Sequence, residues 1–263
     1  MPSVEQLRRY YASYATGSEA PLALSRGTRH DRLRRWYHRL TGDVDPRDFV
    51  PAGPGTRVLD YGCGAAPYLA YFRARGASIA GADMTPAIIA TYRAAGFEVV
   101  LIDQVARIPF PDDEFAIVYL MQVIEHIAQP HAFLREVRRI LRPGGALYLA
   151  MPNARSLWRR VFGADWVTGW YAPFHLFVYS LAGIRTLAHA HGFEVVRARS
   201  ATPDSWLRLN LRARFDPTNH HLDATTTTWL ASLGVRVPVA AVLRLAEVAI
   251  RERDCLLVEL KKC

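Results

Sequence analysis

The stretch Val58-Leu-Asp-Tyr-Gly-Cys-Gly64 decides the fold. An apolar run ends in Asp60, and two glycines spaced by one residue follow it. This order predicts a buried strand that turns sharply on Gly62 and Gly64 into a helix, with Pro67 in the first helical turn. Because glycine has no Cβ, such a turn lets a ligand approach the backbone closely. We therefore expect a nucleotide-like cofactor at this turn.

The next two strand patterns support a cofactor site, although the turn itself does not fit the dinucleotide fingerprint, which needs a third glycine where Pro67 stands. Ser78–Asp83 ends in an acid about twenty residues past the turn, the distance at which a carboxylate reaches ribose hydroxyls. Glu98–Asp103 ends in another acid. Each acid alone could be a turn residue or a helix cap. Three successive strands that each deliver an Asp indicate a ligand at the carboxyl edge of a sheet.

Together with two later motifs, these segments resemble the class I S-adenosylmethionine-dependent methyltransferases. They look most similar to the ubiquinone-biosynthesis O-methyltransferases and their relatives in glycan and secondary-metabolite pathways. The sequence departs from that pattern at Ala66, where the last glycine of the turn is expected, and at Ala116, where relatives usually have Asp. The motifs that carry the resemblance are Val58–Gly64, Gly81–Asp83, Ile108–Phe115, Val123–His126 and Leu141–Gly145.

Strand and helix patterns alternate from Arg57 to Met151, which predicts an α/β fold with a parallel sheet. The resemblance adds a Rossmann-like, seven-stranded, mostly parallel sheet with helices on both faces and an antiparallel last strand. It also implies S-adenosylmethionine as the cofactor, with Asp83 on the ribose hydroxyls and Asp103 on the adenine amino group. Cys63 has packing as an alternative role. The expected cofactor-binding residues are Asp60, Gly62, Cys63, Gly64, Asp83, Met84, Asp103 and Gln122.

The length of 263 residues and an apolar content of 51% suit one main domain with additions. We predict an N-terminal helical segment over residues 1–50, whose tyrosines are either core residues or part of a lid on the cofactor. The methyltransferase domain then covers 51–263, with an insertion at 203–250 between the last two strands. For this insertion a substrate cover, an oligomer contact and an element that touches a membrane all stay open.

The composition also limits the location and the binding partners that we expect for the protein. The sequence shows no apolar segment of signal-peptide type and no stretch long enough to span a bilayer, so a cytoplasmic protein is expected. Three cysteines are too few and too scattered for a disulfide framework or a zinc site. The net charge of +9 invites a nucleic-acid partner. However, most arginines are scattered along helical patterns, and Met121–His126 lacks the signature of base-amine methylation, which argues against that partner.

Methyl transfer depends mainly on positioning the acceptor and excluding water, and a hydroxyl acceptor is helped by a general base. His126, which follows the fourth strand, and His175 are the candidates for that base. The alternatives are a capping or packing role for His126 and a hydrogen bond that locks a loop for His175. Glu125 and His126 are two adjacent side chains and not a ligand set, so we expect no required metal.

The segment Trp166–Phe177 supplies aromatic residues that we expect to wall an acceptor pocket together with His175, namely Trp166, Trp170, Tyr171 and Phe174. The sequence thus predicts a small-molecule methyltransferase that acts on an oxygen of a glycan, a quinone or a secondary metabolite. Two alternatives remain: a methyltransferase of RNA or protein, and a cofactor-binding partner protein without catalysis. The acceptor and the oligomeric state cannot be read from the sequence, because fold does not fix function.

Overall fold

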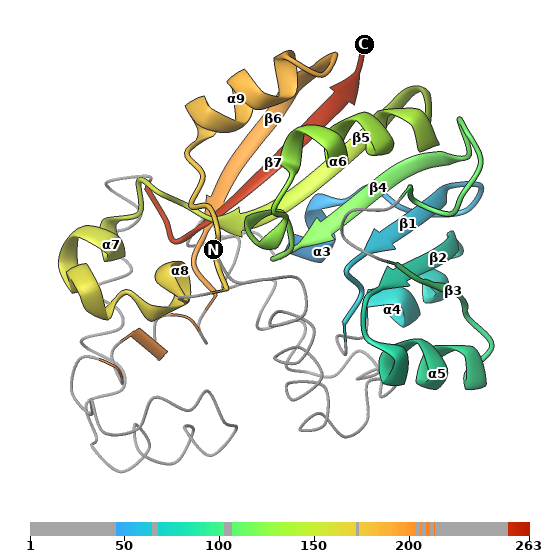
Figure 1. Ribbon diagram of the computed structural model, residues 1–263, viewed down its shortest axis with the longest axis horizontal. Helices are drawn as coiled ribbons and strands as arrows, with labels where there is room; N and C mark the ends of the chain where they lie inside the picture. Colours follow the sequence, from blue (N-terminus) through green and yellow to red (C-terminus); the bar gives the residue numbers. More distant parts are fainter. Residues whose placement is uncertain are drawn as a thin grey trace.

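The computed structural model describes residues 46–64, 68–102, 107–171, 174–203, 206, 209–210, 213 and 252–263. Its strands form one sheet in the order β3-β2-β1-β4-β5-β7-β6 (Figure 1). Strand β7 runs antiparallel to both of its neighbours, and the remaining pairs are parallel. The predicted seven-stranded α/β fold is confirmed. The strands are β1 (Arg57–Tyr61), β2 (Ser78–Asp83), β3 (Glu98–Leu101), β4 (Phe115–Met121), β5 (Leu141–Pro152), β6 (Phe193–Ala201) and β7 (Cys255–Lys262).

Helices cover both faces of this sheet (Figure 1). One face carries α3 (Pro46–Phe49), α4 (Tyr68–Ala74) and α5 (Pro86–Ala94), and the other carries α6 (Pro130–Ile140) and α9 (Leu181–His189). Four short elements follow the carboxyl ends of β4 and β5. They are η1 (Ile124–His126), α7 (Leu157–Phe162), η2 (Gly163–Asp165) and α8 (Val167–Trp170).

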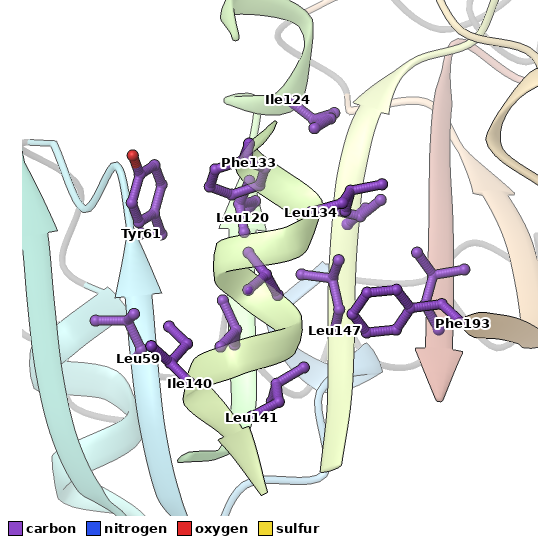
Figure 2. Close-up of a cluster of buried hydrophobic side chains, with 14 of the residues drawn as sticks. Leu59, Tyr61, Leu120, Ile124, Phe133, Leu134, Ile140, Leu141, Leu147 and Phe193 are labelled. Atoms are coloured by element: carbon purple, nitrogen blue, oxygen red, sulfur yellow. The ribbon is translucent and has the colours of Figure 1, made fainter. Parts of the chain in front are cut away.

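Each face of the sheet has its own apolar core, because the central strands are buried on both sides. In β4, Val118 and Leu120 pack on the α6 side, whereas Ile117 and Tyr119 pack on the α4 side. This alternation is the period of a strand, and it explains the continuous apolar run in the sequence. Figure 2 shows α6 lying across β1, β4 and β5 with Phe133 and Leu134 against the sheet. The two cores fix the carboxyl ends of β1, β2 and β4 relative to one another.

Several predictions concern residues that lie outside the described part of the chain. Strand β3 ends at Leu101, two residues before Asp103, which lies outside the described part together with Ala66 and Pro67. The tyrosines of segment 1–50 and most of the insertion at 203–250 also lie outside it. Within the described end of the first segment, Phe49 is buried in the core on the α4 side. In the described ranges, no helix combines the length and apolar character needed to cross a membrane.

Candidate active site

The glycine turn after β1 is held against the end of β2. The backbone N–H groups of Gly62 and Cys63 both donate to the carbonyl oxygen of Ala82, at 2.7 and 3.1 Å. Gly62 and Gly64 have φ angles of +76° and +51°, in the left-handed region where a side chain is strained. The turn is therefore a fixed structure that only glycine adopts at low cost at these two positions.

Gly62 is also required for packing. A Cβ at this position would lie 2.5 Å from Cγ2 of Val123, which follows β4. The sequence reasoning attributed this glycine to the approach of a cofactor. The structure adds a second reason within the protein itself, because the backbone of the turn touches the exit of the neighbouring strand. Among the described residues Gly64 has no such neighbour, since its Cβ would meet only the Gly62 carbonyl oxygen there, at 3.9 Å.

Asp83, the last residue of β2, ties the glycine turn to the second strand. Its Oδ2 accepts from the backbone N–H of Gly64, and its Oδ1 accepts from that of Thr85, both at 2.8 Å. Each carboxylate oxygen offers a second acceptor position beyond the one occupied. The side chain can thus hold the turn in place and still accept from two hydroxyl groups of a ligand.

Asp60, near the end of β1, is 1% exposed, and neither of its carboxyl oxygens has a hydrogen-bond partner among the described residues. Burial, with a smaller effect of the nearby Asp83, raises the pKa of Asp60 to about 8. A buried acid without a partner is costly, and such groups concentrate at functional sites. Asp60 therefore marks a place where the described part of the chain leaves a strong hydrogen-bonding group without a partner.

Three other predicted cofactor residues can be placed. Cys63 is buried in the core on the α4 side, and burial raises the pKa of its thiol, so its contacts are packing contacts. Gln122 has a positive φ of 55°, and its side-chain amide nitrogen lies 3.4 Å from Sγ of Cys255 on β7. Met84 directly follows Asp83 and is partly buried. Binding of a cofactor by these residues stays a prediction.

His126 and His175 are brought together by the fold. Their ring centroids lie 4.7 Å apart in an edge-to-face arrangement. Nδ1 of His126 is 3.0 Å from the carbonyl oxygen of Phe174, and Nδ1 of His175 is 2.7 Å from that of Gly169. Burial, and to a lesser degree His175, lowers the pKa of His126 to about 4, and burial lowers the pKa of His175. Both rings are therefore neutral at pH 7, with the lone pair on Nε2.

Glu125 lies in the same cluster, and sequence reasoning did not include it among the site residues. Its side chain is 0% exposed, and burial raises its pKa to about 8. Glu125, His126 and His175 each offer a ligand atom within 4.8 Å of the others. This spacing does not by itself define a metal site, and the absence of a required metal stays a prediction.

Of the four aromatic residues predicted to wall an acceptor pocket, Tyr171 and Phe174 lie together near His175. The Tyr171 ring lies 5.4 Å from both the Phe174 and the His175 ring. Trp166, in contrast, is fully buried in a separate cluster, and its Nε1 donates to Asp254 at 2.6 Å, so its prediction as a pocket wall is wrong. Its polar N–H needed a buried acceptor, and Asp254 provides it.

The side chain of Trp170 also lies apart from the predicted base residues. Its Nε1 donates to the carbonyl oxygen of Gly163 at 2.8 Å, and its ring borders a hollow of about 620 Å³. Arg159, Arg160 and Ala164 line the same hollow. None of the predicted cofactor or base residues that the structure describes borders it, so we do not identify this hollow with the acceptor site.

Asp254 is a second buried acid that sequence reasoning missed. It accepts hydrogen bonds from Ser156, Trp166 and Asn210 at 2.5, 2.6 and 3.1 Å. Its partners come from distant segments, so it fastens the connection after β5 to the start of β7. Unlike Asp60, this acid is fully partnered, and its role is structural.

A glycine turn and an acid at the end of the second strand, on a sheet of this strand order, define the class I S-adenosylmethionine-dependent methyltransferase fold. A family model described as "Methyltransferase domain" matches residues 25–198. The chain belongs to this methyltransferase domain family.

Individual relatives agree with this assignment. The chain is 34% identical to the ubiquinone biosynthesis O-methyltransferase of Maricaulis maris over 124 residues, which are 44% of this chain and 49% of that protein. It thus spans about half the length of the curated relatives it matches. Among solved structures, an S-adenosylmethionine-dependent methyltransferase from Mesorhizobium loti superposes with a TM-score of 0.54 at 17% identity, covering 82% of this chain and 95% of that one. The [4+2]-cyclase SpnF superposes with a TM-score of 0.60 at 20% identity, covering 99% and 96%.

Proposed function

We propose that this protein transfers a methyl group from S-adenosylmethionine to an oxygen atom of a small-molecule acceptor. The observation that carries the proposal is the buried Asp60, which has no hydrogen-bond partner among the described residues, beside a glycine turn that Asp83 holds in place. The family and the O-methyltransferase among its relatives support the reaction class. A glycan, a quinone or a secondary metabolite is the acceptor class that we propose from the sequence motifs.

The residues present fit this cofactor chemically. Asp60 has no hydrogen-bond partner within the described ranges, and the methionine part of S-adenosylmethionine carries an ammonium group that pairs with a carboxylate. Asp83 has acceptor positions left for the two ribose hydroxyls. Gly64 carries no side chain, and no described residue crowds it, so a ligand can approach the backbone of the turn there. When bound, the cofactor supplies an activated methyl group on a sulfonium.

The protein's own contribution is to hold the acceptor, exclude water and accept a proton. In His126, the Nδ1–H donates to a carbonyl oxygen, so the neutral ring presents the lone pair of Nε2. Proton transfer from an acceptor hydroxyl to this nitrogen turns the ring into an imidazolium. A bound cofactor would supply one positive charge that methyl transfer removes, so the charge gained by the ring would leave the net charge of the site unchanged. This balance favours a histidine base even though burial lowers its pKa.

Two measurements test the proposal. Calorimetry with S-adenosylmethionine measures binding, and release of S-adenosylhomocysteine measures turnover against a panel of phenols, hydroxylated quinols, sugars and carboxylic acids. We expect binding in the micromolar range and turnover with at least one hydroxyl compound. Absence of cofactor binding by the folded protein would refute the proposal. Turnover only with RNA or protein, at an affinity that falls steeply with salt, would move the acceptor to a macromolecule.

A further inference from the structure

Glu125 is a buried acid whose carboxyl group has no hydrogen bond within the described part of the chain. Its side chain is completely inaccessible to solvent, so an ionised carboxylate here would lack water, and no described residue gives it a counter-charge. The group is therefore uncharged at neutral pH, as its raised pKa of about 8 also indicates. An uncharged carboxyl group has an O–H to donate, and it needs an acceptor nearby.

His175 offers that acceptor. Its Nδ1 lies 2.7 Å from the Gly169 carbonyl oxygen, and because a carbonyl only accepts, Nδ1 must carry the hydrogen. The other ring nitrogen, Nε2, then holds the lone pair. This nitrogen lies 3.9 Å from Oε1 of Glu125, and the side chain of His175 is only 7% exposed. The separation exceeds a hydrogen bond by about 1 Å, and site hydrogen bonds often tighten only when a ligand binds.

The backbone already joins the two residues. The Glu125 carbonyl oxygen accepts from the N–H groups of Leu176 and Phe177, at 2.9 and 3.2 Å. The adjacent His126 donates from Nδ1 to the carbonyl oxygen of Phe174. Hydrogen bonds thus connect the turn η1 to the segment 174–177 both before and after His175 in the sequence. Any shift of His175 would also move the carbonyl group that orients His126.

We propose that Glu125 is a positioning residue that holds the Nε2 side of the His175 ring. This proposal rests on the proposed function. The pair Glu125–His175 then keeps segment 174–177 in the place where His126 is correctly oriented. In this arrangement Nδ1 of His175 donates to the Gly169 carbonyl oxygen, and Nε2 accepts from Glu125. His126 is left as the histidine that receives the acceptor's proton.

A double-mutant cycle tests the pair without any knowledge of the acceptor. Glu125→Leu, His175→Leu and the double variant are unfolded with urea at pH 6 and pH 9. At pH 6 we expect a coupling of at least about fivefold in the unfolding equilibrium constant. At pH 9 the carboxyl group is ionised and faces a lone pair, so the coupling should vanish or reverse. A coupling below about twofold at pH 6, or an equal coupling at both pH values, would overturn the proposal.

Several other titratable groups of the described residues face Glu125 and His175. They are the Tyr179 hydroxyl, the Cys255 thiol, the His126 ring and the Tyr171 ring, whose centroid lies 5.4 Å from that of His175. Burial raises the pKa of Tyr179 and of Cys255, so both stay protonated, and His126 stays neutral. Tyr179→Phe is the matched control, because it removes a buried hydroxyl near the same carboxyl group and should leave the coupling unchanged.

The conservative variant Glu125→Gln gives an independent measurement if a leucine variant does not fold. Its amide can still donate to Nε2, so nitrogen NMR should show a His175 Nε2 resonance that is the same at pH 6 and pH 9. In the wild type that resonance should move between the two pH values, and a constant wild-type resonance would contradict the pairing. Calorimetry with S-adenosylmethionine on the wild type tests the proposed function separately, since neither the cycle nor the NMR experiment needs the cofactor.

Discussion

Binding of S-adenosylmethionine should release a proton from Asp60. In the free protein, burial and Asp83 raise the pKa of this carboxyl group to about 8, so it is protonated at slightly acid pH. The ammonium group of the ligand favours the ionised carboxylate strongly, because the two charges meet where water is excluded. Asp60 must therefore lose its proton as the ligand binds.

The size of the effect follows from that pKa. At pH 6.5 the Asp60 carboxyl is almost fully protonated, and an α-amino group with a pKa of about 7.7 is almost fully charged. Binding should then release about one proton per site. Deprotonation costs about 1.4 kcal/mol for each pH unit below the pKa. The apparent Kd should consequently tighten about tenfold between pH 6 and pH 7.

Calorimetry in two buffers with different ionisation enthalpies counts the released protons. Asp60→Asn, checked by a cooperative thermal melt, should bind with no net proton release and with little dependence on pH. S-adenosylhomocysteine retains the ammonium group and lacks the sulfonium, so it should release the same proton. Tight binding without proton release in the wild type, or unchanged release in Asp60→Asn, would refute the assignment of Asp60.

Other changes in the site have separate consequences. Asp83→Ala should weaken S-adenosylmethionine binding by about 1.5–3 kcal/mol and also lower the melting temperature, because Asp83 anchors Gly64; calorimetry showing unchanged affinity would contradict its assignment. Gly62→Ala should destabilise the fold through its contact with Val123, and Gly62→Ala combined with Val123→Ala should recover part of the loss in a urea titration; no recovery would mean that the positive φ dominates. Once an acceptor is found, His126→Ala should lower turnover by about a hundredfold with nearly unchanged cofactor affinity; full turnover would mean catalysis by positioning alone.

Sequence alone predicted the elements whose signal is local. Strand β2 has the predicted ends, because an apolar run bounded by a glycine-containing turn and an acid is a complete local signature. Strand β1 and the glycine turn were predicted for the same reason. The hydrogen bond from the Gly64 N–H to Asp83 could not be predicted in this way. It joins residues 19 positions apart, and their contact depends on how two strands pair.

Sequence reasoning was wrong or incomplete where a distant residue decides the role of a position. Trp166 was predicted to line a pocket, but its N–H donates to the buried Asp254, 88 residues later. The role of Gly62 beside a ligand stays a prediction, and Val123 supplies a further reason for this glycine within the fold. Glu125 was considered only with its sequence neighbour His126. Its carboxyl oxygen lies 3.9 Å from Nε2 of His175, 50 positions away, and no local pattern reveals this neighbour.

Glu125 makes it possible to distinguish proton release on cofactor binding from the pH dependence of protein stability. Its pKa in the folded state matches that of Asp60, at about 8, while its surroundings differ. An unfolded Glu ionises near pH 4.5, so between pH 4.5 and 8 the unfolded state binds fewer protons than the folded state. Stability must therefore fall as pH rises through this window, by at most about 5 kcal/mol. Glu125→Gln should remove this loss, and its advantage over the wild type in urea titrations should grow from pH 5 to pH 8.

The same variant should not change the proton count on cofactor binding. Asp60 stands beside the glycine turn, where a cationic ligand would arrive, whereas Glu125 faces the lone pair of His175 and keeps its proton. Calorimetry at pH 6.5 should thus give about one released proton in both the wild type and Glu125→Gln, and not two. If Glu125→Gln halved a wild-type count of two, the cofactor's charge would reach Glu125 as well, and the separation of a cofactor acid from a positioning acid would be wrong.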